Sequence, residues 1–284
     1  MVGRKNAVDD ATITPEEAAQ VEMGEVNAWI DMYSVLPDDF ARQFGVEMHH
    51  IGDVVLTRSP RIPFVHFNCV KNLGVAQPAT EAALDAALAR YREAGVARCT
   101  IYHTPINQPA QLPEWLLARG LRQQGGWERI YRDAGPLAPL DDVALPGHHV
   151  EKVSADTAAE WAGFIDRCYG LPTSPWLLAF ANRAGWHHYT LRNDAQIVAV
   201  RSMFIDADGR AWLGVEAPVP GMMAPSFAED LQLCAAMVRE GLALGARSFA
   251  ADIEAPDAAM RSPAYANFAR LGFTKLYFRS HYCP

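Results

Sequence analysis

The clearest pattern of apolar and polar positions lies between residues 210 and 282, where short apolar runs alternate with segments of helical spacing. This pattern predicts a strand, a helix, a strand, a helix and a strand in that order. Their expected bounds are Arg210–Val219, Ser226–Leu244, Arg247–Glu254, Pro263–Leu271 and Phe273–Tyr282. Before them, we expect strands at His149–Val153, Trp186–Leu191 and Gln196–Phe204, helices at Ser154–Tyr169 and Pro175–Asn182, and a hairpin at Asn193-Asp194.

The first part of the chain predicts a similar set of elements. A helix is expected at Pro15–Tyr33, because Thr14 followed by Glu17 has the spacing of a capping box. Apolar positions at helical spacing predict a second helix at Pro78–Glu93. Strands are expected at Val46–His50, Val54–Arg58 and Phe64–Val70.

The two parts of the chain resemble each other at an offset of roughly 150 residues, as the two copies of an internal repeat do. Each has a helix that ends near a glycine, Gly95 or Gly245, at the position where a helix end favours a left-handed residue. A short strand follows, Cys99–His103 in one part and Ser248–Asp252 in the other. Because residues 136–147 are rich in proline and glycine, we place a linker there, between domains 1–135 and 148–284.

Composition narrows the function classes. The net charge of −8 argues against nucleic acid as a partner, which requires clustered Lys and Arg. The five cysteines are scattered and odd in number, and the first residues lack the apolar core of a signal peptide, so we expect reduced thiols and a cytoplasmic protein. No apolar run reaches the length of about 18 residues that a membrane span needs, so no membrane partner is expected.

The order of these elements resembles the GNAT superfamily of N-acetyltransferases, in tandem. The best local matches are Phe67–Val70, Trp186–Tyr189, Ala211–Gly214 and Ser262–Phe273. The resemblance covers nearly the whole chain. It implies an α/β (α+β) protein of two GNAT-like domains, each a mixed, mostly antiparallel sheet flanked by helices. It also implies acyl transfer from acetyl-CoA or another acyl-CoA to a small amine. A homodimer is left open.

In that family the turn after the strand at Arg210–Val219 holds the pyrophosphate of CoA, which would involve Gly221, Met223, Ala224 and Ser226 here. The residues of this turn argue against tight binding of an anion. Pro225 lacks an N–H donor, and Ser226 with Glu229 predicts a capping box that occupies the free donors of the following helix. Glu229 and Asp230 add negative charge at the same end. The corresponding turn of the first half, Lys71–Pro78, offers one lysine and one glycine.

The resemblance also implies the candidate chemistry. Glu216 is the candidate general base, and the backbone around Val215–Ala217 is the candidate site that polarises the thioester carbonyl. Phe268 stands where the family often has a tyrosine acid, so Tyr265, nearly one turn earlier, is the substitute candidate. For each residue a purely structural role is the alternative: Glu216 as a solvated strand-end carboxylate and Tyr265 as a packing residue.

Further candidates concern the acceptor. Asp252 and Glu254 share one face of their strand and are candidates to bind a cationic substrate group. Trp212 is a candidate to line the substrate cleft. The three adjacent histidine pairs predict no metal site, because neighbours on a strand point to opposite faces. Two functions therefore remain: an acyl-CoA-dependent N-acyltransferase, which we prefer, and a GNAT fold that acts without CoA as another small-molecule enzyme or binding protein.

Overall fold

A computed structural model describes residues 13–62, 64–140, 144–222, 224–255 and 257–284. The eleven strands of the described chain are β1 (Glu47–Ile51), β2 (Val54–Arg58), β3 (Cys69–Lys71), β4 (Thr100–His103), β5 (Arg122–Asp133), β6 (His148–Lys152), β7 (Trp186–Asn193), β8 (Gln196–Ile205), β9 (Arg210–Pro218), β10 (Ser248–Ala255) and β11 (Thr274–Cys283). The helices are α1 (Pro15–Ser34), α2 (Asp38–Phe44), the short 3-10 helix η1 (Val65–Phe67), α3 (Glu81–Glu93), α4 (Leu112–Ala118), α5 (Ala158–Tyr169), α6 (Ser174–Phe180), α7 (Phe227–Ala243) and α8 (Tyr265–Arg270).

All of these strands form one mixed, mostly antiparallel sheet in the order β1-β2-β3-β4-β11-β5-β10-β9-β8-β7-β6. The last strand, β11, lies between β4 and β5, so the end of the chain is built into the first half of the sheet. In turn, β5 pairs with β10 of the second half along its length. The two halves therefore share hydrogen bonds, and the boundary at residues 136–147 stays a prediction.

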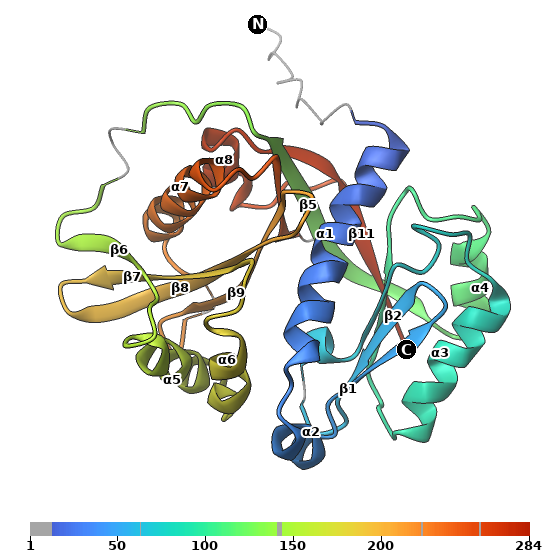
Figure 1. Ribbon diagram of the computed structural model, residues 1–284. Coiled ribbons are helices and arrows are strands. Elements are labelled where there is room, and N and C mark those ends of the chain that lie inside the picture. The colour runs from blue at the N-terminus through green and yellow to red at the C-terminus, as the bar shows by residue number, and fades with distance from the viewer. Residues whose placement is uncertain (1–12, 63, 141–143, 223, 256) are drawn as a thin grey trace, which may run out of the picture.

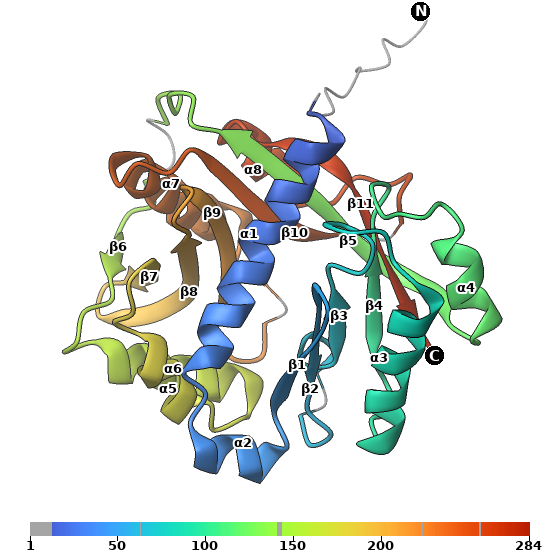
Figure 2. The ribbon, with the colours of Figure 1, turned by 45° about the vertical axis from the view of Figure 1, so that its right-hand side comes forward.

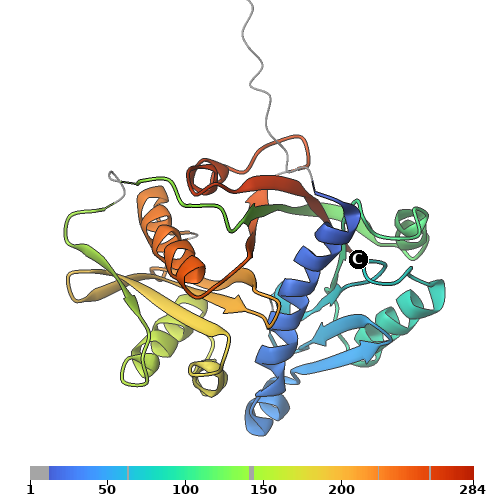
Figure 3. The same ribbon diagram turned by 45° about the horizontal axis from the view of Figure 1, so that its top comes forward.

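Helices cover both faces of this sheet. On one face, α3 and α4 enclose an apolar core with the first half, and α7 and α8 enclose another with the second half. On the opposite face, α1, α2, α5 and α6 pack around a core rich in aromatic side chains. Figure 1 shows α1 between the two halves. Figures 2 and 3 show the same helix crossing the middle of the molecule from two further directions.

The sequence predicted most local features correctly. Thr14 and Glu17 form the expected capping box of α1, and Gly95 and Gly245 have the expected positive φ of 68° and 88°. The Asn193-Asp194 hairpin joins β7 to β8. The strand predicted at Phe64–Val70 was wrong over most of its length, because η1 occupies its centre and only Cys69–Lys71 pair in the sheet. The helix predicted from Pro78 begins at Glu81, after the N-cap Thr80, and the helix predicted from Ser154 begins at Ala158.

None of the helices in the described ranges combines the length and the apolar composition needed to cross a membrane.

Candidate functional site

The sheet opens between β9 and β10. These parallel strands pair only from Ser248↔Arg210 to Ala251↔Leu213, although β10 continues to Ala255 alongside β5. Beyond Leu213, β9 keeps a partner only on its other side, β8. From this point the facing edges of β9 and β10 are no longer joined by the ladder that pairs neighbouring strands in a sheet, and we call this opening of the sheet the gap.

The backbone of β9 is distorted where the gap begins. Gly214 pairs with Ser202 and Ala217 pairs with Val200, so Val215 and Glu216 together oppose the single residue Arg201. This is a β-bulge, a feature that re-aims backbone groups beside functional sites. Val215 has φ of +48°, a conformation that strains a β-branched residue. The strained residue, Val215, is the first of the segment Val215–Ala217 that the resemblance implied as the site for the carbonyl oxygen.

Trp212 is folded over the start of the gap. A Cβ added to Gly214 would lie 2.2 Å from the indole ring of Trp212, so the glycine leaves the space that this ring occupies. The indole also packs against Trp29 of α1, with ring centroids 6.5 Å apart, and its nitrogen has no hydrogen-bond partner among the described residues. Trp212 therefore lies on the α1 side of the gap.

Replacement of Gly214 by alanine is expected to destabilise the fold by about 1–3 kcal/mol, the usual cost of overpacking a filled site. The buried ring of Trp212 would have to move, so we also expect a shift in tryptophan fluorescence. Urea denaturation and emission spectra measure both. Gly163→Ala is the matched control, because a Cβ there meets only the end of Arg167 at 3.4 Å, an ordinary contact. Unchanged stability and emission in Gly214→Ala would contradict this packing.

Glu216 lies at the opposite side of the sheet from Trp212. Its carboxylate forms an ion pair with Arg201, whose guanidinium also lies 3.1 Å from Asp230 Oδ1 of α7 and over the ring of Phe268 in α8. The Glu216 side chain is half exposed, and its backbone carbonyl accepts a hydrogen bond from the Tyr169 hydroxyl. The sequence analysis missed Arg201, Asp230 and Tyr169 as neighbours. The role of Glu216 as base stays a prediction.

Tyr265 begins α8 and packs beside the apolar core under α7. The guanidinium of Arg261 lies over its ring, 4.3 Å from the centroid. Phe268 is buried and packs edge-on against Phe273, as a core residue does. The structure therefore places Tyr265 and Glu216 on the same side of the sheet, and no hydrogen bond joins these two described side chains. The acid role of Tyr265 stays a prediction.

The N-terminus of α7 is closed by the protein itself. The Ser226 hydroxyl accepts from Glu229 N at 3.3 Å, and the Glu229 carboxylate accepts from Ser226 N at 2.9 Å, which is the predicted capping box. Asp230 adds a second carboxylate to this first turn. Gly221 has φ of +90° and Ala224 is exposed in the turn before the helix, whereas Met223 lies outside the described residues. A diphosphate at this end would have to displace the cap and approach two carboxylates.

The surface around this turn is apolar instead of cationic. Val219, Met222 and Phe227 are exposed there, Met222 and Phe227 by about three-fifths of their surface (61% and 59%). This composition differs from a phosphate site, which needs free N–H donors and cationic side chains.

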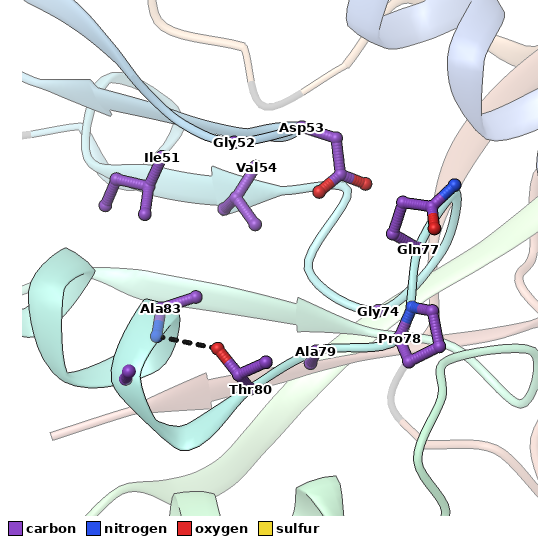
Figure 4. A pocket seen from close by; sticks show the side chains of 11 residues that line it. Ile51, Gly52, Asp53, Val54, Gly74, Gln77, Pro78, Ala79, Thr80 and Ala83 are labelled. Carbon is purple, nitrogen blue, oxygen red and sulfur yellow. Dashed lines mark hydrogen bonds between the residues drawn. The ribbon is translucent and has the colours of Figure 1, made fainter.

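The first half has a pocket at the corresponding place, of about 380 Å³, at the N-terminus of α3 (Figure 4). Its rim carries Asp53 and Gln77, and no lysine or arginine lines it. Thr80 caps α3 by accepting from Ala83 N at 3.1 Å. Lys71, the only lysine of this turn, points into the protein and binds Glu25 at 2.6 Å. This pocket therefore also lacks the charge that a diphosphate needs.

The predicted substrate-binding residues Asp252, Glu254 and Trp212 lie on the α1 side of the gap. Asp252 follows Ala251, the last residue of β10 that pairs with β9. Its Oδ2 accepts from Arg129 Nη1 at 2.9 Å and from Arg279 Nη2 at 2.7 Å. Glu254, two residues later, is exposed and has no part in these bonds. Contact of Asp252, Glu254 and Trp212 with a substrate stays a prediction.

Asp252 belongs to a buried cluster of charges, hereafter the central cluster, which sequence reasoning missed. It joins α1 to strands of both halves. Arg129 binds Glu22 at 2.9 Å and Glu25 at 2.5 Å, and Arg279 binds the same two carboxylates at 3.3 Å and 2.5 Å. With Lys71 on Glu25, the central cluster contains three cations (Lys71, Arg129, Arg279) and three carboxylates (Glu22, Glu25, Asp252).

Burial and pairing act in opposite directions on the pKa values in this cluster. Burial favours the neutral acid, but Arg279, Lys71 and Arg129 hold the pKa of Glu25 well below its ordinary value. For Asp252, burial outweighs the attraction of Arg129 and Arg279 and raises the pKa to about 6. The two carboxylates thus differ in how readily they take a proton.

Histidines and cysteines form no separate site in the described chain. No group of three or more His, Cys, Asp or Glu side chains there is arranged to hold a metal ion, and the five cysteines are free thiols. His188 is buried beside Ser202, with Nδ1 2.7 Å from Oγ, and burial lowers its pKa to about 4. Trp161, Phe180 and Trp186 surround the ring, so His188 is part of the aromatic core.

No family model and no curated protein sequence matches this chain. Solved structures do. A GCN5-related N-acetyltransferase from Kribbella flavida is similar with a TM-score of 0.61 at 15% identity, over 94% of this chain and 95% of that protein. A GCN5-related N-acetyltransferase from Sphaerobacter thermophilus gives 0.58 at 12% identity, over 96% and 93%. A tandem GNAT protein from the clavulanic acid biosynthesis pathway gives 0.51 at 14% identity, over 97% of both chains.

Proposed function

Because the chain has the tandem GNAT fold, we propose that it transfers an acyl group from an acyl thioester, such as acetyl-CoA, to a small amine. The observation that carries the proposal is the gap between β9 and β10, which begins at a strained bulge. Backbone N–H groups fixed in such a bulge can stabilise the negative charge that develops on a thioester oxygen during attack by an amine.

The chain's own residues divide the work between the two sides of the gap. We assign Val215–Ala217 to the acyl carbonyl, Trp212 and Asp252 to the acceptor side, and Glu216 and Tyr265 to the side of α7 and α8. The turn from Gly221 to Ser226 would lie beside the nucleotide end of a CoA donor. The closed cap of α7 and the carboxylates of Glu229 and Asp230 in its first turn do not fit a diphosphate, so we expect the acyl and pantetheine parts to supply most of the affinity.

We expect acetyl-CoA to raise the melting temperature and Glu229→Arg to strengthen this effect. The substitution removes one arm of the cap and reverses a charge in the first turn of α7, which favours an anion by about 1 kcal/mol, or about fivefold in Kd. Thermal shift and calorimetry with acetyl-CoA, and with acetyl-pantetheine as a donor lacking the nucleotide, measure the change.

The control is Glu240→Arg, which makes the same charge change near the other end of α7, where Glu240 pairs with Lys152. We expect it to leave acetyl-CoA binding unchanged. The proposal of a thioester donor is rejected if neither donor shifts the melting temperature of the native protein at millimolar concentration.

One observation favours a second function, a GNAT fold that acts without CoA. The exposed apolar turn with Met222 and Phe227 beside the closed end of α7 is unlike a nucleotide site. A protein that binds small amines but no thioester would satisfy this alternative. Calorimetry with a panel of primary amines in the absence of any thioester distinguishes the two functions.

A further inference from the structure

The pocket between the β1–β2 turn and the start of α3, hereafter the α3 pocket, has the size of a small-molecule site. Its volume of about 380 Å³ lies within the range of about 300–1,000 Å³ that such sites occupy. The strands beside it, β1 and β2, lie at one edge of the sheet, with five strands between β2 and β9 or β10. None of the described residues that line it belongs to β9 or β10, so the α3 pocket is distinct from the gap.

One end of the α3 pocket is polar. Asp53, in the turn between β1 and β2, and Gln77, in the loop before α3, lie there together (Figure 4). The Asp53 side chain is half-buried, and among the described residues only Asn72 approaches its carboxylate, with Nδ2 3.4 Å from Oδ2. None of the described lining residues is a lysine or an arginine. This end therefore offers a carboxylate and an amide oxygen to a ligand, with no cation of the lining to neutralise them.

The rest of the α3 pocket is apolar and has small side chains on one wall. Ile51 and Val54 point into it from the strand side (Figure 4). Ala79 and Ala83 lie opposite, on the side of α3. Ile51 and Ala83 also pack against the apolar core of the first half. Because alanine leaves space that a larger side chain would fill, a short apolar chain fits between these walls.

Hydrogen bonds outside the cavity fix the shape of the α3 pocket. Asn72, in the loop that leads to α3, has φ of +64° and donates from Nδ2 to the Asp53 backbone oxygen at 2.7 Å. This bond ties the loop to the turn that carries Asp53. Below the pocket, Gln108 N donates to Gly74 O at 2.6 Å, and Gln108 O accepts from Ala79 N at 2.7 Å. A ligand would meet a preformed site and would lose little affinity to ordering of the protein.

The positive end of the α3 dipole is already offset by the protein. Thr80 accepts from Ala83 N at 3.1 Å, and Glu81 adds a carboxylate to the first turn. Both groups reduce the partial positive charge that would repel a cation. In Figure 4 the side chains of Asp53 and Gln77 lie at the opposite end of the pocket from Thr80 and Ala83. A cation beside Asp53 is therefore kept away from the helix end.

The lining also distinguishes between kinds of cation. Aromatic rings, which hold quaternary ammonium ions, are absent from the described lining residues. A calcium ion takes six to eight oxygen ligands, whereas the described lining supplies one carboxylate. A primary ammonium needs few acceptors because it has three N–H donors on one compact group.

We propose that the α3 pocket binds a small primary alkylammonium ion. The ammonium group lies between Asp53 and Gln77, where two of its N–H donors find acceptors and the third faces water. The alkyl chain runs between Ile51 and Ala83. This inference concerns the first half of the sheet and does not depend on the acyl transfer proposed above.

The probe is n-butylammonium chloride, and n-butanol is the matched control, because it has the same chain without the charge. We expect n-butylammonium to shift the NMR signal of the Ile51 Cδ1 methyl group with a Kd on the order of millimolar, as suits so small a ligand. n-Butanol at the same concentrations and ionic strength should leave this signal in place. Ile51→Val identifies the signal by removing that methyl group. An amine bound at the gap does not contact Ile51, so the measurement reports on the α3 pocket.

Two variants test the charge and the shape separately. Asp53→Asn should weaken binding of n-butylammonium about 10–100-fold, because it removes a charge-assisted hydrogen bond and keeps the size of the side chain. Asp39→Asn removes an exposed carboxylate of α2 that does not line the pocket, and it should leave the Kd unchanged. Ala83→Leu should fill the apolar end and weaken n-butylammonium more than methylammonium, whose single carbon does not reach that end.

Thermal melting without ligand shows whether each variant is folded. The proposal is overturned if n-butylammonium leaves the Ile51 signal in place, if n-butanol shifts it equally, or if Asp53→Asn binds as the native protein does. If Asp53→Asn does not fold, Ala83→Leu decides the question: a selective loss of n-butylammonium supports the proposal, and an equal effect on both amines contradicts it.

Discussion

Replacement of Glu25 by glutamine is expected to lower the free energy of unfolding by about 3–5 kcal/mol, the usual cost of removing one partner from a buried ion pair. Glu25 binds Lys71, Arg129 and Arg279, and its side chain is 4% exposed. The glutamine would leave three buried cations with two carboxylates. Because α1 reaches both halves through these bonds, we expect a single cooperative transition at lower urea, measured by circular dichroism.

Two further variants separate charge from packing. Glu16→Gln makes the same change on the exposed first turn of α1 and should cost less than about 1 kcal/mol. Adding Lys71→Met to Glu25→Gln removes the cation that forms an ion pair with Glu25 and, among the described residues, with no other carboxylate, so the double variant should recover part of the loss in a double-mutant cycle. A Glu25→Gln protein as stable as Glu16→Gln would show that the central cluster does not join the two halves.

Acid is expected to unfold this protein through its buried histidines. Burial, as the largest cause, lowers the pKa of His66 and His188 to about 4 and that of His281 to about 3. Below pH 6.5 the unfolded chain binds protons on these three rings and the folded chain does not, so stability is present above that pH and is lost as the pH falls. Asp252, with its pKa raised to about 6, acts in the opposite direction and takes one proton in the folded state.

The unfolded chain binds three protons on these histidines, whereas the folded chain binds one on Asp252. The free energy of unfolding should therefore fall by about 2–3 kcal/mol per pH unit between roughly pH 6 and 4.5. Urea denaturation at a series of pH values measures this slope. His188→Phe should reduce it by one proton, because Trp161 and Trp186 already surround the ring with an aromatic environment. If the free energy of unfolding did not change with pH across this window, the three histidine rings would not be buried in their neutral form.

The local elements were largely predictable because their signals lie within a few residues of one another. The capping boxes at Thr14 and Ser226 follow from a spacing of three residues, and the left-handed ends at Gly95 and Gly245 follow from a single residue type. The exception was Phe64–Val70, which has the composition of a strand. Asn68 accounts for the difference, since its side chain binds the backbone of Ser59 and Ile62 and holds a turn there instead.

The candidate site was predictable only in part. The resemblance located the strand Arg210–Val219 and the closed end of α7, and both lie beside the gap. It did not indicate that Arg201 would hold Glu216, because the two residues meet through a bulge that shifts the register by one. A signal for the central cluster was present but went unused: Glu22 and Glu25 stand three residues apart among the apolar positions of α1, on its buried face.

The sequence by itself determined the order of the elements, their ends and the absence of a phosphate-binding pattern after β9, because these depend on side chains and backbone close together in the chain. The tertiary structure alone decided that β11 enters the first half of the sheet and that Glu22, Glu25, Lys71, Arg129, Asp252 and Arg279 form one cluster. These partners are as many as 257 residues apart. Their attraction becomes strong only when folding removes the water between them.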